Sequence, residues 1–130
     1  MSEQLSLLVV DDELLIRDLL YDFFSSQGWD ISVTESGEKA LDLLRNKRFD
    51  MLLTDLKMPQ MDGIALTEEV RNQYPDLPVV IMTGYPSVDS AVAALRQQVA
   101  DYIIKPFNIN QLNKVLRAKI DQAKKRGSNA

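Results

Sequence analysis

The sequence predicts an α/β protein in which five helices cover both faces of a five-stranded, parallel, doubly wound sheet. Two patterns predict this fold class. Short apolar runs recur along the 130 residues, and each is followed by a stretch whose apolar residues repeat with helical spacing. Most of the runs are continuously apolar, which indicates strands that are buried on both faces, as in sheets covered by helices.

The expected strands are short and bounded by polar or turn-forming residues. They are residues 6–10 (SLLVV), 30–35 (DISVTE), 51–54 (MLLT), 78–83 (PVVIMT) and 102–105 (YIIK). The segment 30–35 alternates apolar and polar side chains, whereas the other four are almost entirely apolar. Pro106 ends the last strand.

Each expected strand is followed by an expected helix. In the first helix the apolar positions follow the spacing i, i+3, i+4, i+7 and i+8 from Ile16, and Gly28 is a natural stop. Ser36 and Ser87 are suited to cap the second and fourth helices, and Asn108 to cap the last. For five such β-α units, right-handed crossovers leave few topologies, and the leading one is the flavodoxin-like order 2-1-3-4-5.

Polar residues stand at the carboxyl ends of four of the expected strands. They are Asp11 and Asp12 after the first strand, Asp55 after the third, Thr83 in the fourth and Lys105 in the fifth. Ligands of doubly wound sheets bind outside this edge, so these side chains should converge there. Each residue alone has a structural explanation, such as capping a helix or ending a strand. A structural explanation would have to hold at all four strand ends at once, whereas one shared site explains them together.

Composition restricts the chemistry and the partners. The chain has no His and no Cys, so a reactive centre has to use carboxylates, hydroxyls, lysines or a hard cation. The net charge is −4, and six of the 15 basic residues lie in residues 114–130 beside a single acid. The rest of the chain is therefore strongly acidic and a poor ligand for nucleic acid. Without a run of ~20 apolar residues or a signal-peptide pattern, we expect a cytoplasmic protein with no membrane association.

The acidic strand ends indicate a metal and a phosphoryl group. Neighbouring carboxylates repel one another unless they protonate or a cation lies among them. Without His or Cys the suitable cation is Mg²⁺, which takes one or two carboxylates and completes its shell with water and phosphate oxygens. Lys105 and Thr83 add groups that stabilise a transferring phosphoryl group. A carboxylate can itself be the nucleophile, which would give an aspartyl-phosphate.

The segments LLVVDDE, LLTDLKMPQMDG, VVIMTGY and DYIIKPF resemble the motifs of receiver domains in bacterial two-component response regulators, which have a chemotaxis-regulator-like fold. The resemblance covers about residues 5–123. It implies a receiver (phosphoacceptor) domain over residues 1–123, followed by a basic tail or the start of a linker over residues 124–130. It also implies a signalling switch rather than an enzyme. A sensor histidine kinase or phosphotransfer protein would supply the phosphoryl group, and the domain would catalyse only its own phosphorylation and dephosphorylation.

The resemblance assigns roles to the acidic residues. Asp55 would be the phosphoacceptor. Asp11 and Asp12 would hold Mg²⁺, directly or through water, together with the Asp55 carboxylate and the backbone carbonyl of Lys57.

The resemblance also assigns the switch. Thr83 would hydrogen-bond the phosphoryl group, Lys105 would pair with it, and Tyr102 would be the aromatic switch residue. The Lys105–Pro106 peptide would be cis. Phosphorylation would change the surface made by the fourth helix, fifth strand and fifth helix, which would bind a partner or a second copy of the domain.

Other positions concern the loops around the site. Pro59 and Gly63 would shape the loop after the phosphoacceptor. Lys57 and Tyr85 stand two residues after the phosphoacceptor and after the threonine, the positions that flank the approach of water to the phosphorus in this family. They would tune the lifetime of the phosphorylated form. Gln98 is a departure, because the family usually has glycine there.

Two rival functions and the output remain open to test. A Mg²⁺-dependent aspartyl-phosphate phosphohydrolase of the haloacid-dehalogenase type would need two aspartates spaced one apart, where this chain has Asp11-Asp12-Glu13. A flavin-binding electron carrier would need a Ser/Thr/Gly-rich phosphate loop at the same place. The motifs are similar both to the receivers of nitrogen-regulator-type transcriptional activators and to single-domain phosphorelay proteins, so they do not decide the output.

Overall fold

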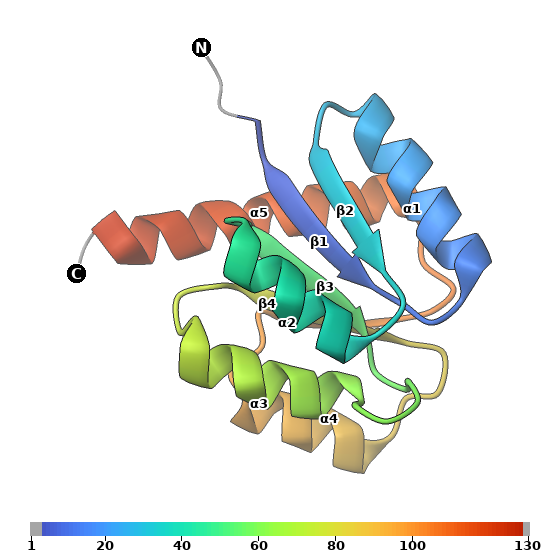
Figure 1. Cartoon of the computed structure of the whole chain (residues 1–130). Coiled ribbons are helices and arrows are strands. Elements are labelled where there is room, and N and C mark those ends of the chain that lie inside the picture. Colours follow the sequence, from blue (N-terminus) through green and yellow to red (C-terminus); the bar gives the residue numbers. More distant parts are fainter. Residues whose placement is uncertain (1–3, 129–130) are drawn as a thin grey trace.

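The computed structural model describes residues 4–128, which form a five-stranded parallel sheet in the order β2-β1-β3-β4-β5 (Figure 1). The strands are β1 (Ser6–Val10), β2 (Asp30–Thr34), β3 (Met51–Asp55), β4 (Val79–Thr83) and β5 (Asp101–Ile104). Each neighbouring pair of strands is parallel. The predicted fold class and strand order are therefore confirmed.

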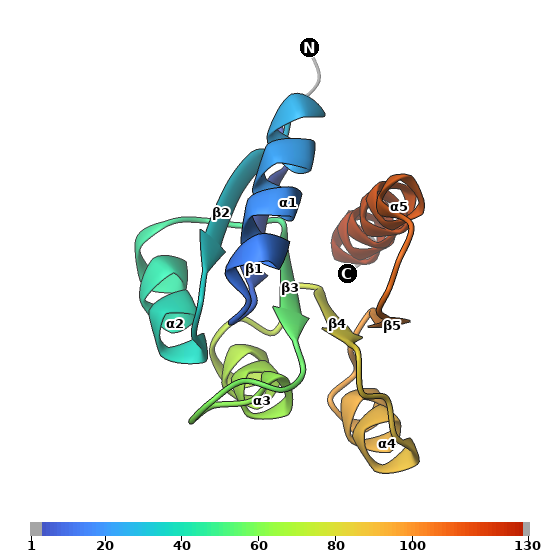
Figure 2. The same cartoon turned by 90° about the vertical axis from the view of Figure 1, so that its right-hand side faces the viewer.

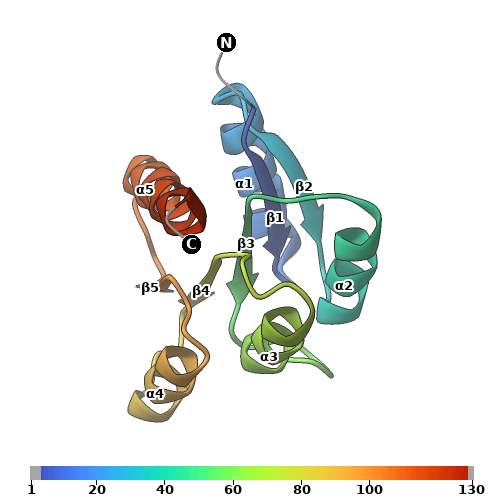
Figure 3. The ribbon, with the colours of Figure 1, turned by 90° about the vertical axis from the view of Figure 1, so that its left-hand side faces the viewer.

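Helices cover both faces of the sheet. They are α1 (Leu14–Ser26), α2 (Gly37–Asn46), α3 (Gly63–Gln73), α4 (Val88–Arg96) and α5 (Ile109–Ser128). Figures 2 and 3 show α1 and α5 on one face and α2, α3 and α4 on the other. Helix α5 includes residues 124–128, where the sequence carries its basic tail. In the described chain, no helix combines the length and the apolar character that crossing a membrane would require.

The strands supply two separate cores, because successive side chains of a strand point to opposite faces. Leu8 and Leu52 pack into the core beneath α2, α3 and α4. Their neighbours Leu7 and Leu53 pack toward α1 and α5. All four side chains are fully buried. This explains why the strand sequences are continuously apolar, and it gives the carboxyl edge of the sheet a rigid support.

The predicted helix caps are present. Ser36 Oγ accepts a hydrogen bond from the Lys39 N–H at the start of α2. Ser87 forms a capping box at the start of α4. Asn108 Oδ1 accepts a hydrogen bond from the Gln111 N–H at 3.0 Å before α5. Local side-chain chemistry therefore fixes where these helices begin.

The turn after α4 forms without the expected glycine. Gln98 has a φ of 58°, in the left-handed region that glycine adopts most easily. Arg71 of α3 stabilises this end of α4, because its Nε donates to the Gln97 carbonyl at 3.1 Å. A second guanidinium nitrogen, Nη1, donates to the Leu77 carbonyl at 2.8 Å. The carboxyl end of α4 is thus attached to the α3–β4 loop.

Candidate functional site

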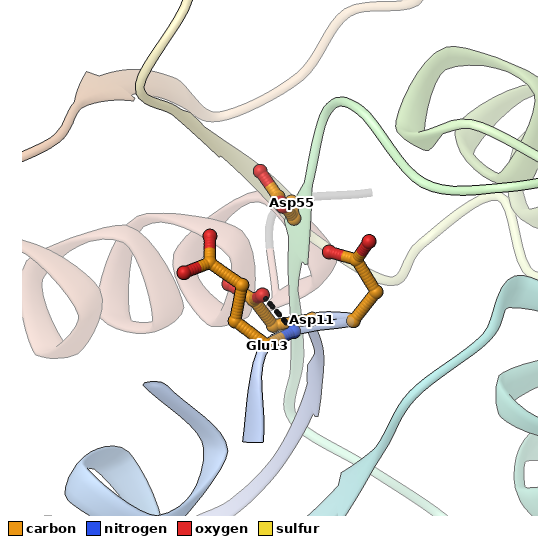
Figure 4. A group of neighbouring side chains, drawn as sticks. Asp11, Glu13 and Asp55 are labelled. Atoms are coloured by element: carbon orange, nitrogen blue, oxygen red, sulfur yellow. Dashed lines mark hydrogen bonds between the residues drawn. The ribbon is translucent and has the colours of Figure 1, made fainter. Parts of the chain in front are cut away.

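The strand-end residues come together at the carboxyl edge of the sheet. Asp55 is the last residue of β3, Thr83 is the last residue of β4, and Asp11 and Lys105 directly follow β1 and β5. Figure 4 shows the side chains of Asp11, Glu13 and Asp55 gathered around the end of β3. Asp11, Asp55 and Thr83 are buried, so this edge holds charged and polar groups with little exposure to water.

Lys105 is the cation at the centre of this group. Its Nζ forms an ion pair of 2.9 Å with Asp11 Oδ2 and lies 3.6 Å from Asp55 Oδ1. Glu13 Oε1 lies at 3.8 Å from the same nitrogen. The lysine side chain is 13% exposed, and the Asp11 side chain is fully buried. One ammonium group therefore faces three carboxylates.

Burial and neighbouring charges shift the pKa of both Asp55 and Lys105. Burial, followed by the charge of Asp11, raises the pKa of Asp55 to about 6, although Lys105 acts in the opposite direction. Burial alone would lower the pKa of Lys105, but its hydrogen bond to Asp11 and the nearby carboxylates raise it above its usual value. A further cation would relieve the repulsion from Asp11, which adds to the effect of burial on the pKa of Asp55.

The acids fit a hard divalent cation. Asp11, Asp12, Glu13 and Asp55 each offer a carboxylate oxygen, and these oxygens lie within 4.8 Å of one another. Oxygen ligands of this kind suit Mg²⁺. Glu13 belongs to this group, although the motifs did not single it out as a ligand. The sequence shows that Glu13 lies next to Asp12, but it does not show in which direction the Glu13 side chain points.

Asp11 and Asp12 do not cap helix α1. The N-cap residue is Glu13, and it makes no side-chain cap hydrogen bond. Asp11 instead accepts a hydrogen bond from the Glu13 N–H at 2.9 Å, and its backbone carbonyl accepts one from Arg17 Nη1 at 2.8 Å. The structural explanation of these two acids as helix caps is therefore wrong, and Asp11 is held toward Lys105.

The remaining predicted residues lie around the same edge. Thr83 Oγ1 accepts a hydrogen bond from the Tyr85 N–H at 2.9 Å. Tyr102 is partly buried, with its hydroxyl 2.6 Å from Ser90 Oγ. Tyr85 is 75% exposed, and Lys57 is also exposed. Of these four side chains, Thr83 is the one that is buried.

Two backbone features lie close to this edge. The Lys105–Pro106 peptide is cis, as the resemblance implied. Gly63, the first residue of α3, donates its N–H to the Leu56 carbonyl at 2.7 Å. This contact brings the start of α3 directly against the end of β3, where Asp55 lies.

Asp55 should make the stability of the metal-free protein depend on pH. Its pKa is about 6 in the folded protein against an ordinary 3.8, so the folded state binds this proton more tightly than the unfolded state. The resulting stabilisation is present below about pH 4 and is lost as the pH rises through about 6. Relative to Asp55→Asn, the wild type should lose about 1–3 kcal/mol of unfolding free energy across that range.

Denaturant unfolding of both proteins in EDTA, at about pH 4 and about pH 7.5, measures this loss. Saturating Mg²⁺ should reduce the loss at the higher pH, because a cation compensates the charge of Asp55. An equal difference between the two proteins at both pH values would contradict the perturbed pKa.

Comparison with known proteins identifies the family. The family model of the response regulator receiver domain matches residues 7–117. The chain belongs to this family and is a receiver domain of two-component response regulators. The aspartyl-phosphate phosphohydrolase is therefore not favoured.

Similar proteins include larger regulators. The transcriptional regulatory protein ZraR of Klebsiella oxytoca is 40% identical over 115 residues, which cover 88% of this chain and 26% of that protein. The DNA-binding transcriptional regulator NtrC of Klebsiella pneumoniae is 42% identical over 103 residues, which cover 79% of this chain and 22% of that protein. The chain thus spans about a quarter of the length of these relatives.

Solved structures agree with the fold. A CheY-like receiver domain protein from Methanospirillum hungatei JF-1 has a TM-score of 0.92 and 27% identity, covering 95% of this chain and 99% of that one. NtrX from Brucella abortus, solved in complex with ATP, has a TM-score of 0.90 and 30% identity, covering 97% of this chain and 29% of that one.

Proposed function

We propose that this receiver domain accepts a phosphoryl group from a sensor histidine kinase or a phosphotransfer protein onto Asp55, with Mg²⁺ as cofactor. The observation that carries the proposal is the position of the Asp55 carboxylate, 3.6 Å from Lys105 and grouped with the acids that suit a divalent cation. Asp11, Asp12, Asp55 and the Lys57 carbonyl would hold the ion. When bound, Mg²⁺ would offset the negative charge of the acids and of the phosphoryl oxygens.

The residues of the chain perform the transfer in an in-line displacement. A carboxylate oxygen of Asp55 attacks phosphorus, an O–P bond forms, and the bond from phosphorus to the donor breaks with its electron pair leaving on the donor atom. The Lys105 ammonium stabilises the charge on the phosphoryl oxygens. The Thr83 hydroxyl can donate a hydrogen bond to the same group. The domain therefore catalyses its own phosphorylation and, with water as nucleophile, its own dephosphorylation.

Uptake of phosphoryl from a small donor tests this function. We expect acetyl phosphate with Mg²⁺ to increase the intact mass of the chain by one phosphoryl group, and EDTA to prevent the increase. Acetate in place of acetyl phosphate is the control for non-covalent adducts. A chain that stays unmodified over a range of donor and Mg²⁺ concentrations would refute the proposal.

The output surface is proposed from a group of exposed apolar side chains. On α4, on β5 and in the loop before α4 these are Tyr85 (75% exposed), Val88 (79%), Val92 (40%), Leu95 (74%) and Ile104 (54%). Apolar groups gathered in this way mark interaction sites on soluble proteins. We propose that phosphorylation, acting through Thr83 and Tyr102, changes the surface of α4, β5 and α5 so that it binds a second copy or an effector.

Sedimentation decides whether the partner is a second copy of the domain or an effector. With Mg²⁺ and beryllofluoride, which mimics the phosphoryl group, the wild type should change from monomer to dimer. Val88→Ser, which removes an exposed apolar side chain of α4, should weaken the dimer. A constant mass at high concentration would reject the homodimer and leave an effector as the partner.

The lifetime of the phosphorylated form should depend on Lys57 and Tyr85. Water must reach phosphorus opposite Asp55, and a long cation and a bulky ring at these positions would obstruct it. We expect Lys57→Asn and Tyr85→Glu each to speed phosphate loss about three- to tenfold, or about 1 kcal/mol in barrier. Phosphate release with Mg²⁺ and no kinase measures this. Lys125→Asn, in an exposed part of α5, is the control, and unchanged rates in both variants would exclude obstruction by these side chains.

The setting of the domain is also a proposal. Because the relatives are transcriptional regulators about four times longer, we propose that this chain is the receiver part of a cytoplasmic transcriptional regulator. DNA binding would then belong to another part of that protein, since the acidic chain is a poor ligand for nucleic acid. The extent of the native reading frame beyond Ala130 tests this directly.

A further inference from the structure

The hydroxyl of Tyr102 has a specific partner on helix α4. Ser90 Oγ lies 2.6 Å from the Tyr102 hydroxyl, within hydrogen-bonding distance, and both residues are partly buried. Ser90 also belongs to the capping box of α4, in which the Ser90 N–H donates to Ser87 Oγ at 3.0 Å. Ser90 Oγ accepts from the Ser87 N–H at 3.3 Å. One side chain therefore joins the first turn of α4 to a residue of β5.

We propose that Ser90 is a positioning residue that couples Tyr102 to the start of α4 and favours the unphosphorylated arrangement. The inference rests on the proposed switch role of Tyr102 and adds the partner through which the ring reaches the helix. In this view the Ser90–Tyr102 hydrogen bond breaks when the domain switches, so the bond opposes phosphorylation.

The bond should break because the Thr83 hydroxyl oxygen would have to move from the Tyr85 N–H toward the phosphoryl group. In the structure, Thr83 Oγ1 accepts the Tyr85 N–H, which holds the loop between β4 and α4 against the strand. A phosphoryl group on Asp55 would draw the hydroxyl toward its strong acceptor oxygens. The Tyr85 N–H then loses its acceptor, and the loop that leads into Ser87 and Ser90 is released.

The carboxyl end of α4 stays held in place, unlike the released loop that precedes the helix. Arg71 Nε donates to the Gln97 carbonyl at 3.1 Å, and Arg71 Nη1 donates to the Leu77 carbonyl at 2.8 Å. The guanidinium therefore attaches the carboxyl end of α4 to the α3–β4 loop. A displacement of the β4–α4 loop is thereby concentrated in the first turn of the helix, where Ser90 meets Tyr102.

The predicted effect is measurable. A hydrogen bond between neutral groups contributes about 1 kcal/mol to stability, so its loss should shift the switch equilibrium about fivefold. Titration with beryllofluoride in saturating Mg²⁺, followed by backbone amide NMR shifts, should show about fivefold tighter binding for Ser90→Ala than for the wild type. Ser90→Thr keeps the hydroxyl and should stay close to the wild type.

A double-mutant cycle with Tyr102→Phe separates this bond from the helix cap. Ser90→Ala also removes part of the capping box, but in a Tyr102→Phe background it removes nothing else. We therefore expect Ser90→Ala to tighten binding in the wild-type background and to have little effect in the Tyr102→Phe background. Equal effects in both backgrounds, or none in either, would overturn the inference.

The outcomes distinguish this inference from the function on which it rests. If the wild type does not bind beryllofluoride, the proposed phosphoacceptor site is wrong. If the wild type binds and Ser90→Ala matches it, the site stands and the role of Ser90 is wrong. Should Ser90→Ala fail to fold, Tyr102→Phe alone decides, because it removes the same bond without touching the cap, and unchanged affinity in it would reject the coupling.

Discussion

Replacing Asp55 with Asn is expected to abolish phosphoryl uptake from acetyl phosphate. The amide keeps the size of the side chain but its oxygen is not a nucleophile, so no aspartyl-phosphate can form. Lys105 and the other acids remain, which means that any residual labelling would identify another acceptor. Intact mass after incubation with acetyl phosphate and Mg²⁺ measures the result.

A charge-matched control makes this result specific. Asp42→Asn removes one carboxylate from an exposed position on α2, where Asp42 pairs with Arg45. It changes the net charge equally and should accept phosphoryl at the wild-type rate. Labelling of Asp55→Asn at the rate of Asp42→Asn would show that Asp55 is not the acceptor.

The effect of Asp55→Asn on stability should be opposite to its effect on activity. The wild-type carboxylate has a raised pKa because burial and Asp11 disfavour its charge. Removing that charge relieves repulsion in the metal-free protein, as the pH dependence described above requires. A variant that is inactive yet more stable cannot be explained by misfolding. The proposed phosphoacceptor role and the stability of the fold are therefore separable by experiment.

The sequence was sufficient to predict that the candidate residues converge, because each strand is short and buried. In a doubly wound sheet, the residues at the carboxyl ends of parallel strands must meet at one edge. The position of Asp55 at the end of β3 and of Thr83 at the end of β4 follows from the apolar runs alone. The register of the sheet, with Thr83 opposite Ile104, then places Lys105 beside them.

Details that depend on side-chain direction could not be predicted. Glu13 follows Asp12 in a loop, and only its rotamer places it within reach of Lys105. The contact between Ser90 and Tyr102 joins a helix to a strand 12 residues away, and it depends on how α4 lies against β5. Helical periodicity identifies neither pair, because both depend on tertiary packing rather than on spacing.

Gly63 is the position where substitution should do most damage to the fold around Asp55. A Cβ atom at this first residue of α3 would lie 2.4 Å from the Asp55 carbonyl oxygen and 3.0 Å from the Leu56 Cα. Both neighbours are backbone atoms, so no flexible side chain can move aside. The helix would have to separate from the end of β3 and would weaken the hydrogen bond of 2.7 Å between the Gly63 N–H and the Leu56 carbonyl.

We expect Gly63→Ala to lower the unfolding free energy by about 1–3 kcal/mol, as overpacking of close backbone contacts does. Phosphoryl uptake should slow by up to about a hundredfold, because displacement of Asp55 misaligns it with Lys105. Gly84→Ala is the matched control for stability, since its Cβ would meet only the Lys105 Cβ at 4.0 Å, an ordinary contact distance. Thermal unfolding and acetyl phosphate labelling of both variants test the comparison. If Gly63→Ala unfolds and labels like the wild type, the close approach of α3 to β3 does not position Asp55.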